Sequence, residues 1–97
     1  MTTQEMKQIL FDKLQAENTC FTKSDISIEK HGNDYIIVIK DYEHFPFKMT
    51  FEYDDYFGFV VWVLSKDHEE IAFTNSKKDY DIETALIYLG YYIGTRF

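Results

Sequence analysis

Few residues in this chain could perform covalent chemistry. Cys20 is the single cysteine, and the three histidines are His31, His44 and His68. A cysteine becomes an activated nucleophile when a histidine lies beside it to take its proton. All three histidines fall in predicted turns, and nothing in the sequence brings one of them to Cys20. A lone cysteine between a helix and a strand is more often a small buried apolar residue, so we expect a protein that is not an enzyme.

Two short segments combine imidazole and carboxylate groups, which are permissible ligands for a divalent ion. They are Asp41-x-Glu43-His44 and Asp67-His68-Glu69-Glu70. Neither has the glycine and the terminal glutamate of a calcium-binding loop, and solvated turns commonly collect such residues. We therefore expect no metal site, and the absence of a glycine-rich phosphate loop predicts no cofactor either.

Carboxylates are the most informative side chains of the sequence. The 97 residues include 17 acidic and 10 basic side chains, with a formal net charge of -7. Residues 1–50 hold eight acids and six bases, whereas residues 51–97 hold nine acids and four bases. Arg96 is the single arginine, so no basic stripe is available for phosphate contacts, and direct nucleic-acid binding is disfavoured.

The elements that must position these carboxylates follow from hydrophobic periodicity. Apolar residues at helical spacing predict a helix over 3–18, stopped at Asn18-Thr19, and a second helix over 81–94. Period-two and apolar runs between them predict strands near 26–29, 35–40, 47–54, 59–64 and 71–74. This order predicts a single α+β domain over 1–97: an N-terminal helix, a five-stranded antiparallel meander and a C-terminal helix, in two or three layers.

The strands at 35–40 and 59–64 are apolar on both parities, so both faces of the sheet need cover near them. Two arrangements remain open. Each helix can cover one face, or both helices can pack on the same face. The second arrangement would expose Trp62 and its neighbours, a patch that a monomer rarely leaves bare, and it would call for a partner or a second copy.

Length and composition also limit where the protein works. The longest nearly unbroken apolar run, Phe57–Leu64, is eight residues long, whereas a membrane-spanning helix needs about 20. The first 18 residues carry charges throughout and contain no secretory apolar region. A single thiol suits a reducing compartment, so we expect a soluble, cytoplasmic protein.

A meander brings alternate loops to the same end of its sheet, which gathers the carboxylates. The first candidate partner-binding residues are Glu52, Asp54, Asp55 and Tyr56; the second set is Asp67, Glu69 and Glu70. A negative surface interleaved with tyrosines could dock onto a basic partner, steered by complementary charge. The competing interpretation is that the acids serve solubility and the start of the second helix.

A second candidate interface lies in the last helix, where Gly90 and Gly94 form a Gly-x-x-x-Gly beside Tyr88 and Tyr91. Amphipathic tyrosines suit a contact surface, so these four residues could join two copies of the chain. The alternative is that the glycines let the helix lie close on the sheet, with Gly94 also ending the helix.

In size, acidity and aromatic content the chain resembles small acidic proteins of phages and mobile elements, such as anti-CRISPR proteins. That resemblance implies an inhibitor that occupies the basic nucleic-acid channel of an enzyme, and it implies no particular residue. The leading hypothesis is a non-catalytic module that binds a protein with a basic surface, such as a nucleic-acid-handling enzyme. The alternative is a homodimeric assembly protein that uses an apolar sheet face or the last helix.

Overall fold

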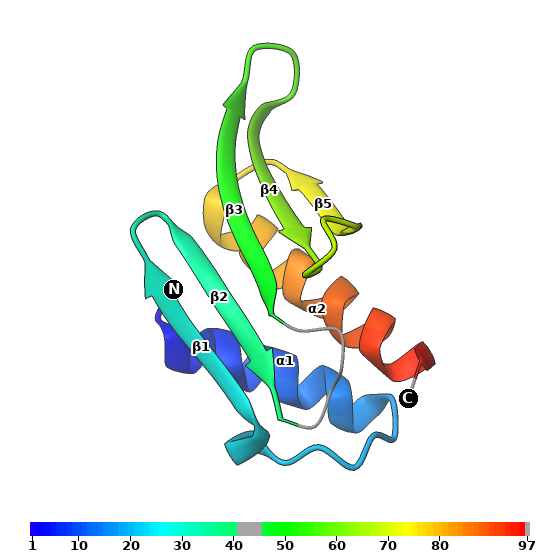
Figure 1. The fold of residues 1–97 in the computed structure, drawn as a ribbon. Helices are drawn as coiled ribbons and strands as arrows, with labels where there is room; N and C mark the ends of the chain where they lie inside the picture. Colours follow the sequence, from blue (N-terminus) through cyan, green and yellow to red (C-terminus); the bar gives the residue numbers. More distant parts are fainter. Residues whose placement is uncertain (41–45, 97) are drawn as a thin grey trace.

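Two helices flank five consecutive strands along the chain (Figure 1). The computed structural model describes residues 1–40 and 46–96. The elements are α1 (Thr3–Ala16), a 3-10 turn η1 (Lys23–Asp25), β1 (Ile26–His31), β2 (Asp34–Ile39), β3 (Phe47–Asp54), β4 (Gly58–Leu64), β5 (Glu70–Asn75) and α2 (Lys78–Arg96). The strands pair antiparallel in the order β1-β2-β3-β4-β5, which confirms the predicted α+β meander. No described helix is long and apolar enough to cross a membrane.

Local hydrogen bonds define both ends of α1. The Thr2 hydroxyl accepts from the N–H of Glu5 at 3.1 Å, and the Glu5 carboxylate accepts from the N–H of Thr2 at 3.2 Å, which is a capping box. The bond from the Thr2 N–H lowers the pKa of the Glu5 carboxyl below its usual range. At the other end Asn18 takes a left-handed conformation with φ 60, and Asn18 and Thr19 donate their N–H groups to carbonyls of the last turn. Asn18 and Thr19 thus act as the predicted stop, although the helix itself ends at Ala16, two residues before the predicted end.

Both helices pack on one face of the sheet, so the protein has two layers (Figure 1). Alternate strand residues point to this inner face and are fully buried: Ile37 and Ile39 of β2, Phe47 and Met49 of β3, and Val61 and Val63 of β4. They meet the apolar stripe of each helix in one core cluster: Met6, Leu10 and Leu14 of α1, and Ile82, Ala85, Leu86, Leu89 and Ile93 of α2. Of the two arrangements left open by the sequence, the structure has the one with both helices on the same side.

The two helices approach each other closely because α2 presents glycines to α1. A Cβ at Gly90 would lie 2.6 Å from Cγ and 2.9 Å from Cβ of Lys13. A Cβ at Gly94 would lie 2.5 Å from Cβ of Glu17. Lys13 lies on α1 and Glu17 caps the end of that helix, and the two are joined by an ion pair of 2.7 Å between Lys13 Nζ and Glu17 Oε1. The glycines therefore serve helix packing, against the other helix rather than against the sheet.

Two details of α2 correct the sequence-based expectation. The helix begins at Lys78, three residues before the predicted start, and runs on to Arg96. Gly94 therefore lies inside the helix and does not end it. Gly90 and Gly94 were candidates for an interface between two copies, with close packing on the sheet as the alternative; the structure has Lys13 and Glu17 of the same chain in front of them.

The β3–β4 hairpin extends beyond the helices (Figure 1). Tyr53 belongs to the inner face by its register, in line with Met49 and Phe51, yet it is 76% exposed. The turn is tied by the Asp54 carboxylate, whose Oδ1 accepts from the N–H groups of Tyr56 at 2.7 Å and of Phe57 at 2.9 Å. The hairpin tip is thus ordered locally while standing free of the core.

Replacing Gly90 by alanine tests the close approach of the helices. Alanine should gain about 1 kcal/mol of helix propensity. The overlap with Lys13 forces a shift of the helix pair, and overpacking of this kind typically costs about 1–3 kcal/mol. We expect Gly90→Ala to lower the free energy of unfolding in urea.

The exposed Tyr88→Ala on the same helix is the control and should have little effect. Adding Lys13→Ala to Gly90→Ala should recover part of the loss, because it removes the nearest atom. A Gly90→Ala protein as stable as the wild type would contradict this packing.

Candidate functional site

The sheet face that points away from the helices carries apolar side chains with no covering layer among the described residues. We call it the open face. By strand register it consists of Ser27, Glu29 and His31 of β1, Asp34, Ile36 and Val38 of β2, Lys48, Thr50, Glu52 and Asp54 of β3, Gly58, Val60, Trp62 and Leu64 of β4, and Glu70, Phe73 and Asn75 of β5. Ile36, Val38, Trp62, Leu64 and Phe73 are each only partly buried. The sequence predicts such an exposed patch if both helices pack on the same face, because the strands at 35–40 and 59–64 are apolar on both faces.

Aromatic rings form a continuous chain across one part of the open face. Trp62 and Phe73 lie opposite each other on β4 and β5, with ring centroids 4.8 Å apart at an angle of 65°. Phe73 meets Phe57 at 5.7 Å and 80°, and Phe57 meets Tyr56 at 4.9 Å and 85°. An edge-to-face pair of aromatic rings stabilises the fold by about 0.5–1.5 kcal/mol beyond the effect of burying the ring surface. The loop residue Phe57 is held in the chain by the Asp54 turn.

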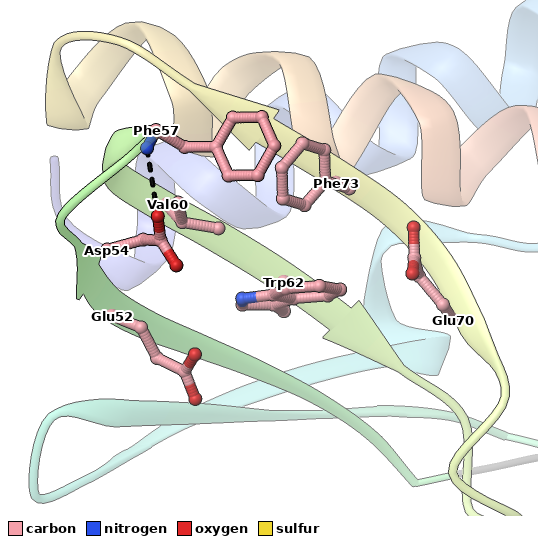
Figure 2. A pocket seen from close by; sticks show the side chains of 7 residues that line it. All are labelled: Glu52, Asp54, Phe57, Val60, Trp62, Glu70 and Phe73. Carbon is pink, nitrogen blue, oxygen red and sulfur yellow. Dashed lines mark hydrogen bonds between the residues drawn. The ribbon is translucent and has the colours of Figure 1, made fainter.

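A cavity of about 440 Å³ opens beside these rings, and we call it the Trp62 pocket. Its lining residues are Glu52, Asp54, Phe57, Val60, Trp62, Glu70 and Phe73. Figure 2 shows the indole across the middle, Glu52 and Asp54 on the β3 side, and Glu70 on the β5 side. The described lining therefore combines aromatic walls with three carboxylates and includes no basic residue.

A β-bulge places Glu70 at this pocket. Val63 pairs with Ala72, but Leu64 pairs with Glu70, so Ile71 is an extra residue in β5. Paired residues share a face, so Glu70 joins Leu64 on the open face, while Ile71 packs against the core. Without the bulge, Ile71 would lie beside Leu64 and the carboxylate would move to the other side.

The three pocket carboxylates have no cationic partner in the described chain. Among residues 1–40 and 46–96, no ion pair includes Glu52, Asp54 or Glu70. Glu52 and Glu70 also accept no hydrogen bond there, whereas Asp54 accepts the two turn bonds described above. The three carboxylates are exposed to solvent, and no cation among the described residues neutralises their charge.

The indole of Trp62 contains an unsatisfied donor. Its Nε1 is buried and has no hydrogen-bond acceptor within the described residues. Figure 2 shows this edge of the ring turned to the β3 side, where Glu52 and Asp54 lie. A buried donor without a partner costs about 1–3 kcal/mol. Among the described residues, the indole is held by ring contacts such as that with Phe73.

A second hollow of about 380 Å³ lies on the same face, and we call it the Lys48 hollow. Its charged and titratable lining residues are Lys48, Lys66, His68 and Glu52, and its apolar floor includes Ile36 and Leu64. Lys48 Nζ lies 3.5 Å from the carboxylate of Asp34. The open face therefore has an acidic hollow at the rings and a mainly basic one beside it.

The structure brings together some of the predicted partner-binding residues and separates others. Glu52, Asp54 and Glu70 meet at the Trp62 pocket. Asp55 and Tyr56 lie at the exposed hairpin tip, where Tyr56 borders the aromatic chain. Asp67 and Glu69 lie in the β4–β5 turn and do not line the pocket. Each predicted set therefore contributes some residues to the Trp62 pocket, and the other members of each set lie outside it.

Residues outside the open face also had predicted roles. Tyr88 and Tyr91 are 53% and 55% exposed on α2, and their role as an interface stays a prediction. Cys20 was expected to be buried, which is wrong: it is exposed in the connection after α1. Asp81 was expected only as a negative charge at the helix start, but it is fully buried, and its Oδ1 accepts from the Ser76 hydroxyl at 2.9 Å.

The described residues contain no group of three or more His, Cys, Asp or Glu side chains placed to hold a metal ion. The Asp41-x-Glu43-His44 segment falls outside the described residues. Comparison with known proteins gives no further indication, since no protein-family model, no curated protein and no solved structure matches this chain.

Sequence reasoning missed the aromatic partners of the site. The sequence predicts exposure of Trp62 only if both helices share a face, and it does not single out Phe73 or Phe57. The register of β4 with β5 sets Phe73 opposite Trp62, and the turn bonds of Asp54 position Phe57. The alternation of Ala72, Phe73 and Thr74 was the available signal for Phe73, whereas the Ile71 bulge had none.

Trp62→Phe tests the unsatisfied indole donor. The change removes some ring contacts but also removes the buried N–H, whose isolation costs about 1–3 kcal/mol. We expect the two effects to offset, leaving the free energy of unfolding within about 1 kcal/mol of the wild type when followed by circular dichroism.

Phe73→Leu is the matched comparison, since it shrinks the neighbouring ring without removing a polar group. It should lose about 1 kcal/mol or more. A loss near 3 kcal/mol for Trp62→Phe would mean that Nε1 has an acceptor in solution.

Proposed function

We propose that this chain is a non-catalytic protein-binding module that docks its open face onto a basic surface of another protein. The observation that carries the proposal is the uncovered apolar sheet face with three unpaired carboxylates around its aromatic chain, all within the described residues. Because both described helices pack on the other side, no helix among residues 1–40 and 46–96 covers this face. Extended apolar patches commonly mark interaction sites.

The composition of the open face supports such a contact. Aromatic residues are enriched where protein interfaces are fully buried, and tryptophan and tyrosine are frequent among the residues that dominate binding energy. Trp62, Phe73 and Phe57 supply this apolar centre. Glu52, Asp54 and Glu70 surround it as a polar rim, and their charge would steer a basic partner and select against an acidic one.

Selection from a displayed random peptide library tests the proposal, because it requires no particular partner at the outset. Wild-type protein should enrich basic peptides that also carry apolar residues, and Trp62→Ala should lose the selected peptides while remaining folded. Because exposed charges are screened within about 10 Å at 0.1 M salt, affinity should fall by about tenfold or more from low to high NaCl.

Tyr88→Ala is the control, because Tyr88 is an exposed aromatic residue on α2, away from the open face. It should leave peptide binding unchanged. Selected peptides that bind Trp62→Ala normally but fail on Tyr88→Ala would move the docking surface to α2. Binding that is indifferent to salt would remove the carboxylates from the proposed function.

A homodimer is the second candidate, and it is favoured because the Trp62 pocket is acidic while the neighbouring Lys48 hollow is mainly basic. A two-fold axis through the open face would set the Trp62 pocket of one copy against the Lys48 hollow of the other, since such an interface is self-complementary. We expect light scattering to detect a dimer at micromolar concentration in that case, and Lys66→Glu to dissociate it. A monomer over this range would leave the open face to a different protein.

A further inference from the structure

The Trp62 pocket has walls that favour a cation. Trp62, Phe73 and Phe57 are joined edge to face and line one cavity. Aromatic faces carry negative electrostatic potential and attract cationic groups within about 6 Å of the ring centroid, with tryptophan the best of the three types. No lysine or arginine of the described chain lies over any of these three rings, although Lys78 lies over Phe51 on the inner face at 5.1 Å. Within the described residues, the faces of the pocket rings therefore remain free to receive a cation from another molecule.

Carboxylates flank the indole from both neighbouring strands. Trp62 pairs with Thr50 on β3 and with Phe73 on β5. Glu52 lies one diagonal step away on β3, and Glu70, brought to this face by the bulge, lies on the opposite diagonal on β5. Diagonal neighbours of this kind are about 7–8 Å apart, which long side chains can bridge. A cation above the indole would thus be within reach of acids on two sides (Figure 2).

The arrangement suits a guanidinium group better than a metal ion. A metal requires several oxygen or nitrogen ligands converging at about 2.0–2.6 Å, and the pocket carboxylates are spread along the aromatic wall. A guanidinium is planar, stacks on aromatic faces and presents donors in several directions at once, so it can satisfy carboxylates on opposite sides. The cavity of about 440 Å³ is within the usual range of binding pockets, and it can admit one long side chain.

We propose that the Trp62 pocket is a binding site for the guanidinium group of an arginine presented by the docked protein, stacked on the indole and held between Glu52 and Glu70. This inference rests on the proposed function only in taking the open face as the docking surface. It adds the chemical group that is recognised and the residues that recognise it.

The chain supplies a specific reporter for this site, because Trp62 is its only tryptophan. A single indole N–H signal therefore appears in a ¹H–¹⁵N NMR spectrum, and it belongs to the pocket. Titration with Nα-acetyl-arginine methylamide at constant ionic strength should shift this signal saturably. The citrulline analogue has nearly the same shape without the charge, and its affinity should be lower by about tenfold or more.

Substitutions separate the pocket from the rest of the face. Glu52→Gln combined with Glu70→Gln should weaken arginine binding by about tenfold or more, and neither side chain has a hydrogen bond in the described fold that its loss would disturb. Lys48→Gln is the control, since Lys48 lies on the same face but outside the pocket. It should leave arginine binding unchanged or slightly stronger.

Several results would overturn the inference. These are the absence of a saturable shift with the arginine probe, equal shifts with citrulline, and binding unaffected by the double glutamine variant. A shift of the indole signal with protein concentration alone would assign the pocket to a second copy instead. If the arginine probe fails while library peptides still require Trp62, the docking surface stands and the guanidinium site does not.

Discussion

The contact between α1 and α2 is the constraint on which the rest of the structure depends. Gly90 and Gly94 allow the helix axes to come close enough for Lys13 and Glu17 to pack directly on the α2 backbone. Helices joined in this way form one layer and cover one face of a five-stranded sheet. The opposite face is left with residues that are apolar enough to be buried yet have no described element above them. The candidate site is therefore a result of helix packing on the other side of the molecule.

The chemistry of that face arises from strand register rather than from any sequence motif. Pairing of β4 with β5 sets Phe73 against Trp62, and pairing of β3 with β4 places Glu52 within reach of the same indole. The residues come from three strands and one turn. Each would be unremarkable alone, since exposed acids and partly buried aromatic residues occur on most proteins. Their convergence on one cavity gives the face its proposed selectivity for a basic partner.

Much of the fold could be predicted because its strands and helices show clear periodicity. The strand at 47–54 was predicted with its observed bounds, since Phe47, Met49 and Phe51 alternate strictly with polar residues. The side on which the helices pack could not be predicted, because the strands at 35–40 and 59–64 are apolar on both parities and favour neither face. Gly90 likewise gave no indication of whether it faced the sheet, a second chain or the other helix.

The candidate site was predicted only in its acidic part. Glu52 and Asp54 could be placed on the polar side of their strand by alternation, but Glu70 required the bulge, which has no signature in the local sequence. Cys20 was misplaced because composition at a helix–strand junction does not determine exposure. In each case the missing information is a tertiary or cross-strand relation, which residue spacing alone does not contain.

The bulge at Ile71 has a consequence for how the surface could diverge. In β5 the bulge adds Ile71 to the core side, between Ala72, which pairs with Val63, and Glu70, which pairs with Leu64 on the open face. A deletion of Ile71 would therefore leave Glu70 opposite Leu64 in a regular ladder and keep the charged rim, while the core would lose one apolar side chain. A substitution at the exposed Glu70, by contrast, would change the rim of the open face and leave the core side of β5 as it is, so partner choice on this sheet could evolve separately from folding.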